Sequence, residues 1–154
     1  MTARERIFFF SFFFFDDQLT PRDSVLCVAT AMAATAEEQV IESVLVLFAM
    51  AAEAAPFVLH AGLTPAQGLL PSQLSCAVFT GVSHGVRLTV VTSGTDRVHG
   101  VDAVGTVPAA LAAFAALQAF KPDLFVNAGT AGGFKALGGA VGDVRVPSTS
   151  CFQA

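Results

Sequence analysis

Two groups of residues in this sequence could do chemistry on a bound ligand. The first is Glu53, a carboxylate that follows the apolar run Ser43–Phe48 and could act as a general base. The second is Thr130, whose hydroxyl could bond a sugar or a carbonyl group from within the glycine-rich segment Asn127–Phe134. The glycines of that segment would let the backbone approach a ligand closely. Together the two groups indicate a small-molecule site with a base and a hydroxyl.

Each group also has a purely structural explanation. A lone glutamate at a helix start is favoured by the helix dipole without any catalytic role. The Gly-x-x-Gly-Gly spacing at 129–133 can be only a tight turn, because it is neither the dinucleotide-binding fingerprint nor a Walker loop. No G-x-S-x-G nucleophile elbow occurs in the sequence. The histidines have no partners at triad or i, i+4 spacing, and we expect them on the surface or in loops: His60, His84 and His99.

The elements on either side of Glu53 would place it at one end of a sheet. Ser43–Phe48 is an uninterrupted apolar run, typical of a strand buried on both faces of a parallel α/β sheet. The composition of Ala51–His60 predicts a helix directly after it. Ligands bind beyond the carboxyl ends of strands in such sheets. Glu53 would therefore face that crevice.

Further along the chain, the glycine and proline breakers of Thr64–Leu74 predict a loop. Ala77–Thr80 and Arg87–Thr92 predict two strands joined through Gly81–Gly85. The alanine-rich segment Val104–Phe120 predicts a helix packed on the sheet. Its larger apolar residues recur at helical spacing: Leu111, Phe114, Leu117 and Phe120.

A strand at Leu124–Val126 then completes a strand, helix, strand order that predicts a right-handed parallel crossover. Another strand is expected within Gly138–Val146. Three loops would converge at the ligand-binding end of the sheet: Ala49–Glu53, Ser93–Gly100 and Ala128–Gly133.

The composition indicates one globular domain and excludes several classes of function. The chain has 154 residues, of which 54% are hydrophobic and 13% charged. A net charge of −4 with scattered basic residues argues against a nucleic-acid partner. The three cysteines are odd in number and lack metal-ligand spacing. We therefore expect a reducing, cytoplasmic location, with no disulfide framework, no metal site and no cofactor.

The phenylalanine-rich run Ile7–Phe15 is only nine residues long, whereas a membrane span needs about 20. Arg4 and Arg6 precede it in the manner of a secretory signal. However, Asp16, Asp17 and the polar residues after them separate the run from any cleavage site. We expect neither a membrane segment nor a targeting signal.

Five segments of this sequence, taken in order, resemble motifs of one known family: Phe48–Ala54, Val104–Ala109, Lys121–Asp123, Asn127–Phe134 and Gly142–Val144. In these segments the chain resembles the nucleoside phosphorylase/nucleosidase family, most closely the 5′-methylthioadenosine nucleosidases of plants. The resemblance spans about Val44–Val144. It implies a mixed, twisted α/β sheet flanked by helices and a homodimer. It also implies hydrolysis of the N-glycosidic bond of methylthioadenosine, or in some members S-adenosylhomocysteine, with release of adenine.

The resemblance also assigns roles to individual residues. Glu53 matches the glutamate that activates the attacking water at the anomeric carbon. Thr130 matches a hydroxyl residue that lines the pocket beside the ribose. Ala131 and Gly132 match pocket backbone near the base, and Ala49 matches a position beside the water and the sugar. Glu53 is therefore the predicted catalytic residue, and Thr130, Ala131, Gly132 and Ala49 are the predicted substrate-binding residues.

A phosphorylase remains the alternative enzyme. Phosphorylase relatives attack with phosphate, and many carry an arginine where this chain has the neutral Asn127. A neutral side chain binds a dianion poorly, which favours water as the nucleophile. Arg97, in another of the candidate loops, could still supply a positive charge.

The chain departs from the family pattern after Val144. The family's Met-Glu segment for the ribose hydroxyls and its Ser-Asp acid for the leaving adenine are not found, so the resemblance is to a C-terminally incomplete fold. We predict a low-complexity, disordered leader over residues 1–40, the nucleoside phosphorylase-like domain over 41–146, and a divergent tail over 147–154. We expect weak or no activity, because general acid catalysis alone contributes about 10²–10⁴-fold. A non-catalytic subunit that pairs with a full-length enzyme is a further alternative.

Overall fold

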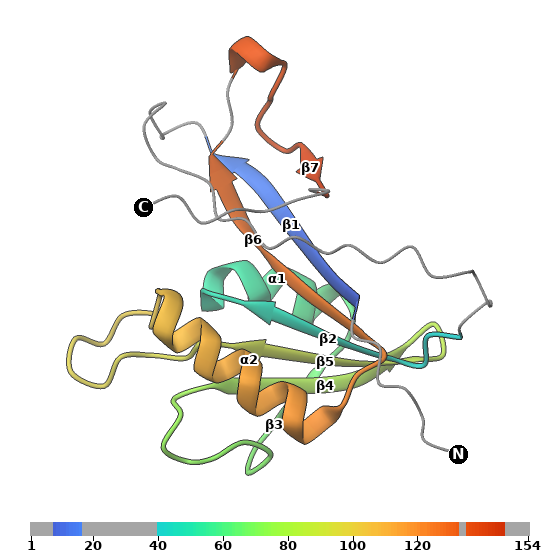
Figure 1. Ribbon diagram of the computed structural model, residues 1–154, viewed down its shortest axis with the longest axis vertical. Helices are drawn as coiled ribbons and strands as arrows, with labels where there is room; N and C mark the ends of the chain where they lie inside the picture. The colour runs from blue at the N-terminus through green and yellow to red at the C-terminus, as the bar shows by residue number, and fades with distance from the viewer. Residues whose placement is uncertain (1–7, 17–39, 133–134, 147–154) are drawn as a thin grey trace.

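The computed structural model describes residues 8–16, 40–132 and 135–146. Its strands are β1 (Phe8–Asp16), β2 (Ser43–Phe48), β3 (Thr64–Ala66), β4 (Ala77–Ser83), β5 (Val86–Thr92), β6 (Leu124–Gly132) and β7 (Val144–Arg145). Its helices are α1 (Ala51–His60), α2 (Thr106–Phe120) and a short 3₁₀ helix, Lys135–Leu137. The strands form one mixed sheet in the order β3-β4-β5-β2-β6-β1-β7 (Figure 1). The predicted mixed α/β sheet flanked by helices is confirmed.

The centre of the sheet is the parallel trio β5, β2 and β6. Val46 of β2 lies opposite Val90 of β5 and Val126 of β6. The last four residues of β2 are all buried, as expected for a strand covered on both faces. The predicted bounds of this strand, and those of α1 after it, agree with the structure.

The two helices cover opposite faces of this sheet (Figure 1). Because side chains alternate along a strand, Leu45 and Leu47 pack with α2 while Val46 and Phe48 pack with α1. Ala54 is the buried residue of α1 on its side. Among the described residues, neither helix is long and apolar enough to cross a membrane.

The packing of α2 differs from the prediction. Its fully buried residues are Ala112 and Ala116, one helical turn apart, whereas Leu111 and Phe114 are 50% and 67% exposed. Only Leu117 and Phe120 of the predicted apolar set are packed against the core. The helix is apolar on nearly every side, so periodicity could not identify its inner face. The sheet approaches α2 closely enough that alanine occupies the contact.

Four strands also differ from the prediction. β4 and β5 extend further toward each other than expected, so that only His84 and Gly85 form the turn, both with positive φ (51° and 81°). The predicted loop Thr64–Leu74 begins with the edge strand β3. The strand expected within Gly138–Val146 is limited to the two residues of β7.

The predicted loop Ala128–Gly133 is instead strand as far as Gly132. β6 pairs with β2 up to Ala128 and with β1 over its whole length. The backbone of β1 therefore supplies the partner that extends β6. β1 lies within residues 1–40, the segment for which the sequence predicts disorder. Residues 1–7, 17–39 and the predicted tail 147–154 lie outside the described residues.

Candidate active site

Glu53 is placed by the turn from β2 into α1. β2 ends at Phe48 and α1 begins at Ala51, so Glu53 lies in the first helical turn. The backbone N–H of Met50 donates a hydrogen bond to Glu53 Oε2 at 3.2 Å. Such a bond satisfies one of the free amides of the helix start. Glu53 as a whole residue is half-buried.

Thr130 approaches the same carboxylate from β6. Its backbone N–H and its hydroxyl Oγ1 each donate a hydrogen bond to Glu53 Oε1, both at 2.7 Å. The two residues are 77 positions apart in the sequence. They meet because β2 and β6 are parallel neighbours, with Phe48 opposite Ala128, so the chain after each strand reaches the same edge. The structure therefore joins the two chemical groups predicted from the sequence.

Gly129 borders this contact. A Cβ atom at position 129 would lie 3.4 Å from Glu53 Oε1 and 3.5 Å from Oε2, which is ordinary van der Waals contact. The carboxylate therefore does not by itself require a glycine at this position. The neighbour of the glycine-rich segment here is a side chain of this chain.

Asp102 is a site residue that sequence reasoning missed. Its Oδ2 accepts a hydrogen bond from the N–H of Ala51, the first residue of α1, at 3.3 Å. An isolated antiparallel bridge to Thr95 holds Asp102 in place. A carboxylate at a helix N-terminus is stabilising. No sequence signal pointed to it, because it is 51 residues from its partner.

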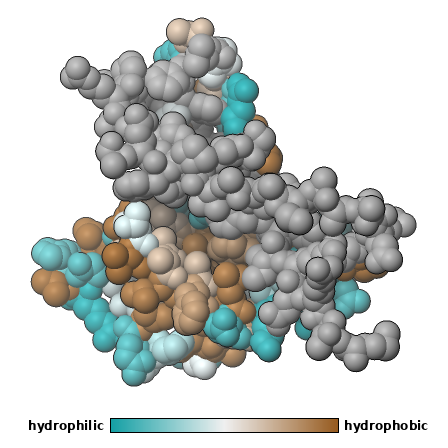
Figure 2. Space-filling view, viewed as in Figure 1, coloured by the Kyte–Doolittle hydropathy of each residue, from teal (hydrophilic) through white to brown (hydrophobic). Residues whose placement is uncertain are grey.

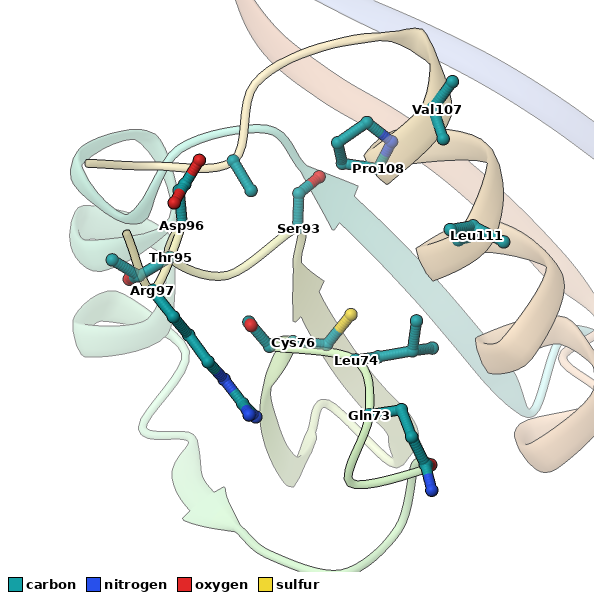
Figure 3. A pocket seen from close by; sticks show the side chains of 12 residues that line it. Gln73, Leu74, Cys76, Ser93, Thr95, Asp96, Arg97, Val107, Pro108 and Leu111 are labelled. Atoms are coloured by element: carbon teal, nitrogen blue, oxygen red, sulfur yellow. The ribbon is translucent and has the colours of Figure 1, made fainter. Parts of the chain in front are cut away.

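The predicted ligand-binding loop Ser93–Gly100 lines a pocket that is separate from Glu53 and Thr130. It borders an open pocket of about 240 Å³ on the α2 side of the sheet, whose walls include Leu74, Cys76, Ser93, Arg97, Pro108 and Leu111 (Figure 3). Burial raises the pKa of the Cys76 thiol, so this group is neutral at pH 7. Within the described residues, the buried Ser93 Oγ has no hydrogen-bond partner. This pocket contains neither Glu53 nor Thr130.

Arg97, the cation considered for phosphate binding, belongs to that pocket. Its guanidinium donates to the backbone oxygen of Ser72 at 3.1 Å. Asp96 beside it accepts bonds from the N–H groups of Val98 and His99 within its own turn. The arginine therefore supports a surface loop in this structure.

The family model of the phosphorylase superfamily matches residues 43–153 of this sequence. This chain belongs to the phosphorylase superfamily. The matched range contains Glu53, Thr130 and every element of the sheet except β1. The family resemblance noted in the sequence is therefore confirmed.

Two curated members of the superfamily from Arabidopsis thaliana are similar to this chain. It is 45% identical to a 5′-methylthioadenosine nucleosidase over 114 residues, which cover 73% of this chain and 43% of the relative. It is 38% identical to a 5′-methylthioadenosine/S-adenosylhomocysteine nucleosidase over 118 residues, which cover 76% of this chain and 46% of the relative. The chain thus spans less than half the length of these relatives.

Solved structures of superfamily members share the fold. The apo form of the Arabidopsis 5′-methylthioadenosine nucleosidase matches with a TM-score of 0.65 and 45% identity, covering 68% of this chain and 43% of that one. An MTA/SAH nucleosidase structure matches with a TM-score of 0.66 and 37% identity, over the same shares of both chains.

The remaining predicted site residues lie along the same edge of this superfamily sheet. Ala49 follows the end of β2, and Ala131 and Gly132 continue β6 beyond Thr130; all three are half-buried. Asn127 lies opposite Leu47 of β2, three residues before Thr130. The roles of these residues toward a ligand stay predictions.

Proposed function

We propose that this chain hydrolyses the N-glycosidic bond of 5′-methylthioadenosine, with S-adenosylhomocysteine as a second candidate substrate. The bonding of Glu53 to Thr130 at the carboxyl edge of the sheet carries this proposal. The similarity to nucleosidases supports the substrate class. In this proposal the chain acts in the cytoplasm, in methionine salvage, and releases adenine and a thioribose.

The proposed chemistry uses Glu53 as the base for water. Oε1 already accepts two short hydrogen bonds from Thr130, whereas Oε2 accepts one longer bond from Met50. A water molecule can therefore donate to Oε2 and attack the anomeric carbon as the bond to adenine breaks. The proton of the water passes to the carboxylate, and adenine leaves with a proton from a general acid. Glu53 supplies one half of this acid and base pair.

Among the described residues, we assign none as the proton donor for the leaving adenine. General acid catalysis contributes about 10²–10⁴-fold to such reactions. We therefore expect slow turnover by this chain.

Adenine release from methylthioadenosine by the wild-type chain and by Glu53→Gln tests the proposal. Release that depends on Glu53 and is unchanged by added phosphate would support hydrolysis. Formation of a thioribose phosphate that rises with phosphate concentration would support the phosphorylase alternative instead. Equal release by both proteins would remove Glu53 from the reaction.

The outer face of α2 supports a proposal about assembly. Val107, Leu111 and Phe114 are 67%, 50% and 67% exposed and recur at helical spacing. Apolar surface gathers over this helix in Figure 2. Continuous apolar patches of this kind commonly mark protein interfaces. We propose that these three residues, the α2 apolar face, pair two copies of the chain, or one copy with a full-length enzyme.

A further inference from the structure

The contact between Thr130 and Glu53 is more specific than a general lining role would require. Two donors from one residue converge on a single carboxylate oxygen, Oε1, each at 2.7 Å. Hydrogen bonds to an ionised acceptor are shorter and roughly twice as strong as neutral ones. Thr130 is exposed while Glu53 is half-buried, so the pair lies at the surface that a ligand would reach.

The direction of these bonds limits what Thr130 can do for a sugar. A hydroxyl carries one proton, and Thr130 donates it to Glu53. The hydroxyl oxygen can then only accept a bond from a ribose hydroxyl. In the unliganded chain, the proton of the Thr130 hydroxyl is therefore used for the bond to Glu53.

The other neighbours of the carboxylate leave one oxygen less occupied. Oε2 accepts only the 3.2 Å bond from Met50 N–H among the bonds of the described residues. Rotation of the carboxylate would break both short bonds of Thr130 to Oε1. The two oxygens are therefore held in unequal roles.

We propose that Thr130 is a positioning residue that fixes Glu53 Oε1 and thereby presents Oε2 to the attacking water. The inference rests on the proposed nucleosidase function and deepens it. It differs from the role implied by the family resemblance, in which Thr130 lines the ribose pocket. The backbone N–H of Thr130 retains one of the two bonds in any side-chain variant, so loss of the hydroxyl loosens the carboxylate without freeing it.

Thr130→Val and Thr130→Ser form a matched pair of variants. Valine keeps the β-branched shape and removes the hydroxyl, whereas serine keeps the hydroxyl. We expect kcat for methylthioadenosine to fall about tenfold or more in Thr130→Val, with KM within about twofold, because a bond to a charged group is lost. Thr130→Ser should stay within a few-fold of the wild-type kcat.

The division between kcat and KM gives a readout that a merely structural role would not move. A residue that only lines the ribose pocket would raise KM on substitution, whereas a residue that orients the base lowers kcat. Recovery of kcat in Thr130→Ser would assign the effect to the hydroxyl and not to the shape of the side chain.

A structural measurement that needs no turnover separates this inference from the proposed function. Crystal structures of the unliganded proteins should show one orientation of the Glu53 carboxylate in the wild type and in Thr130→Ser, and more than one in Thr130→Val. Failure of the wild-type chain to release adenine would refute the function, while the crystal structures would still decide the contact. A single, unchanged carboxylate orientation in Thr130→Val, or a raised KM with an unchanged kcat, would overturn the positioning role.

Discussion

At the scale of single residues, one position in the loop after β5 requires a glycine. Gly94, after β5, combines a φ of +80° with a neighbour that leaves no space for a side chain: a Cβ there would overlap the backbone carbonyl of Ser75 and lie 2.8 Å from Cys76 N. The loop that lines the α2 pocket therefore depends on Gly94.

Gly94→Ala should lower the free energy of unfolding by at least about 3 kcal/mol, because the left-handed strain adds to a clash with backbone atoms that cannot move aside. Gly100→Ala is the matched control. Gly100 has a φ of +68° but no atom within 4 Å of its would-be Cβ. Its substitution should cost only about 1–2 kcal/mol, the strain alone. Equal losses in urea unfolding of the two variants would contradict this reasoning.

At the scale of elements, Asp123 fastens the start of β6 to the start of β2. Its Oδ2 accepts bonds from Ser43 Oγ at 2.8 Å, Ser43 N at 2.9 Å and Glu42 N at 3.1 Å. The hydrogen bond from the Ser43 hydroxyl is the main cause that lowers the pKa of Asp123 below its ordinary value. Asp123 thus aligns β2 and β6 at their first residues, the ends of the strands that lie away from Glu53 and Thr130.

Asp123→Asn should lower stability by about 1 kcal/mol at pH 7, because an amide is a weaker acceptor and solvent screens this site. A carboxyl whose pKa is lower when folded stabilises the protein fully above its ordinary range, about pH 4. That contribution is lost as pH falls through the folded pKa. The difference in unfolding free energy between wild type and Asp123→Asn should therefore shrink below pH 4. A difference that stays constant down to pH 3 would count against this clamp.

The elements also show what the sequence could predict. Ser43–Phe48 and Ala51–His60 were predicted with the observed bounds, because an uninterrupted apolar run followed by a helix-forming segment has one physical solution in an α/β sheet. The length of β6 was not, since it depends on a partner, β1, more than a hundred residues earlier. Similarly, the local sequence pattern predicted Glu53 and Thr130 as candidate site residues. The bond between them and the contact of Asp102 with α1 could not be predicted, because both depend on the order of the strands.

At the scale of the whole molecule, the α2 apolar face predicts association. Phe114→Glu would place a charge on that face without disturbing the core, because the side chain is 67% exposed. We expect the wild type to sediment as a dimer and Phe114→Glu as a monomer with unchanged circular dichroism. Val98→Glu is the control, since Val98 is 85% exposed and lies outside α2. A monomeric wild type, or dimers in all three proteins, would refute this interface.

The central claim is that Glu53 activates water for cleavage of a nucleoside. The most direct measurement compares adenine release from 5′-methylthioadenosine by the wild-type chain and by Glu53→Gln under phosphate-free conditions. The amide keeps the size of the side chain but cannot accept the proton of water. We predict a loss of about 10²–10⁴-fold, the usual contribution of a general base. Release at the same rate by Glu53→Gln would contradict the account.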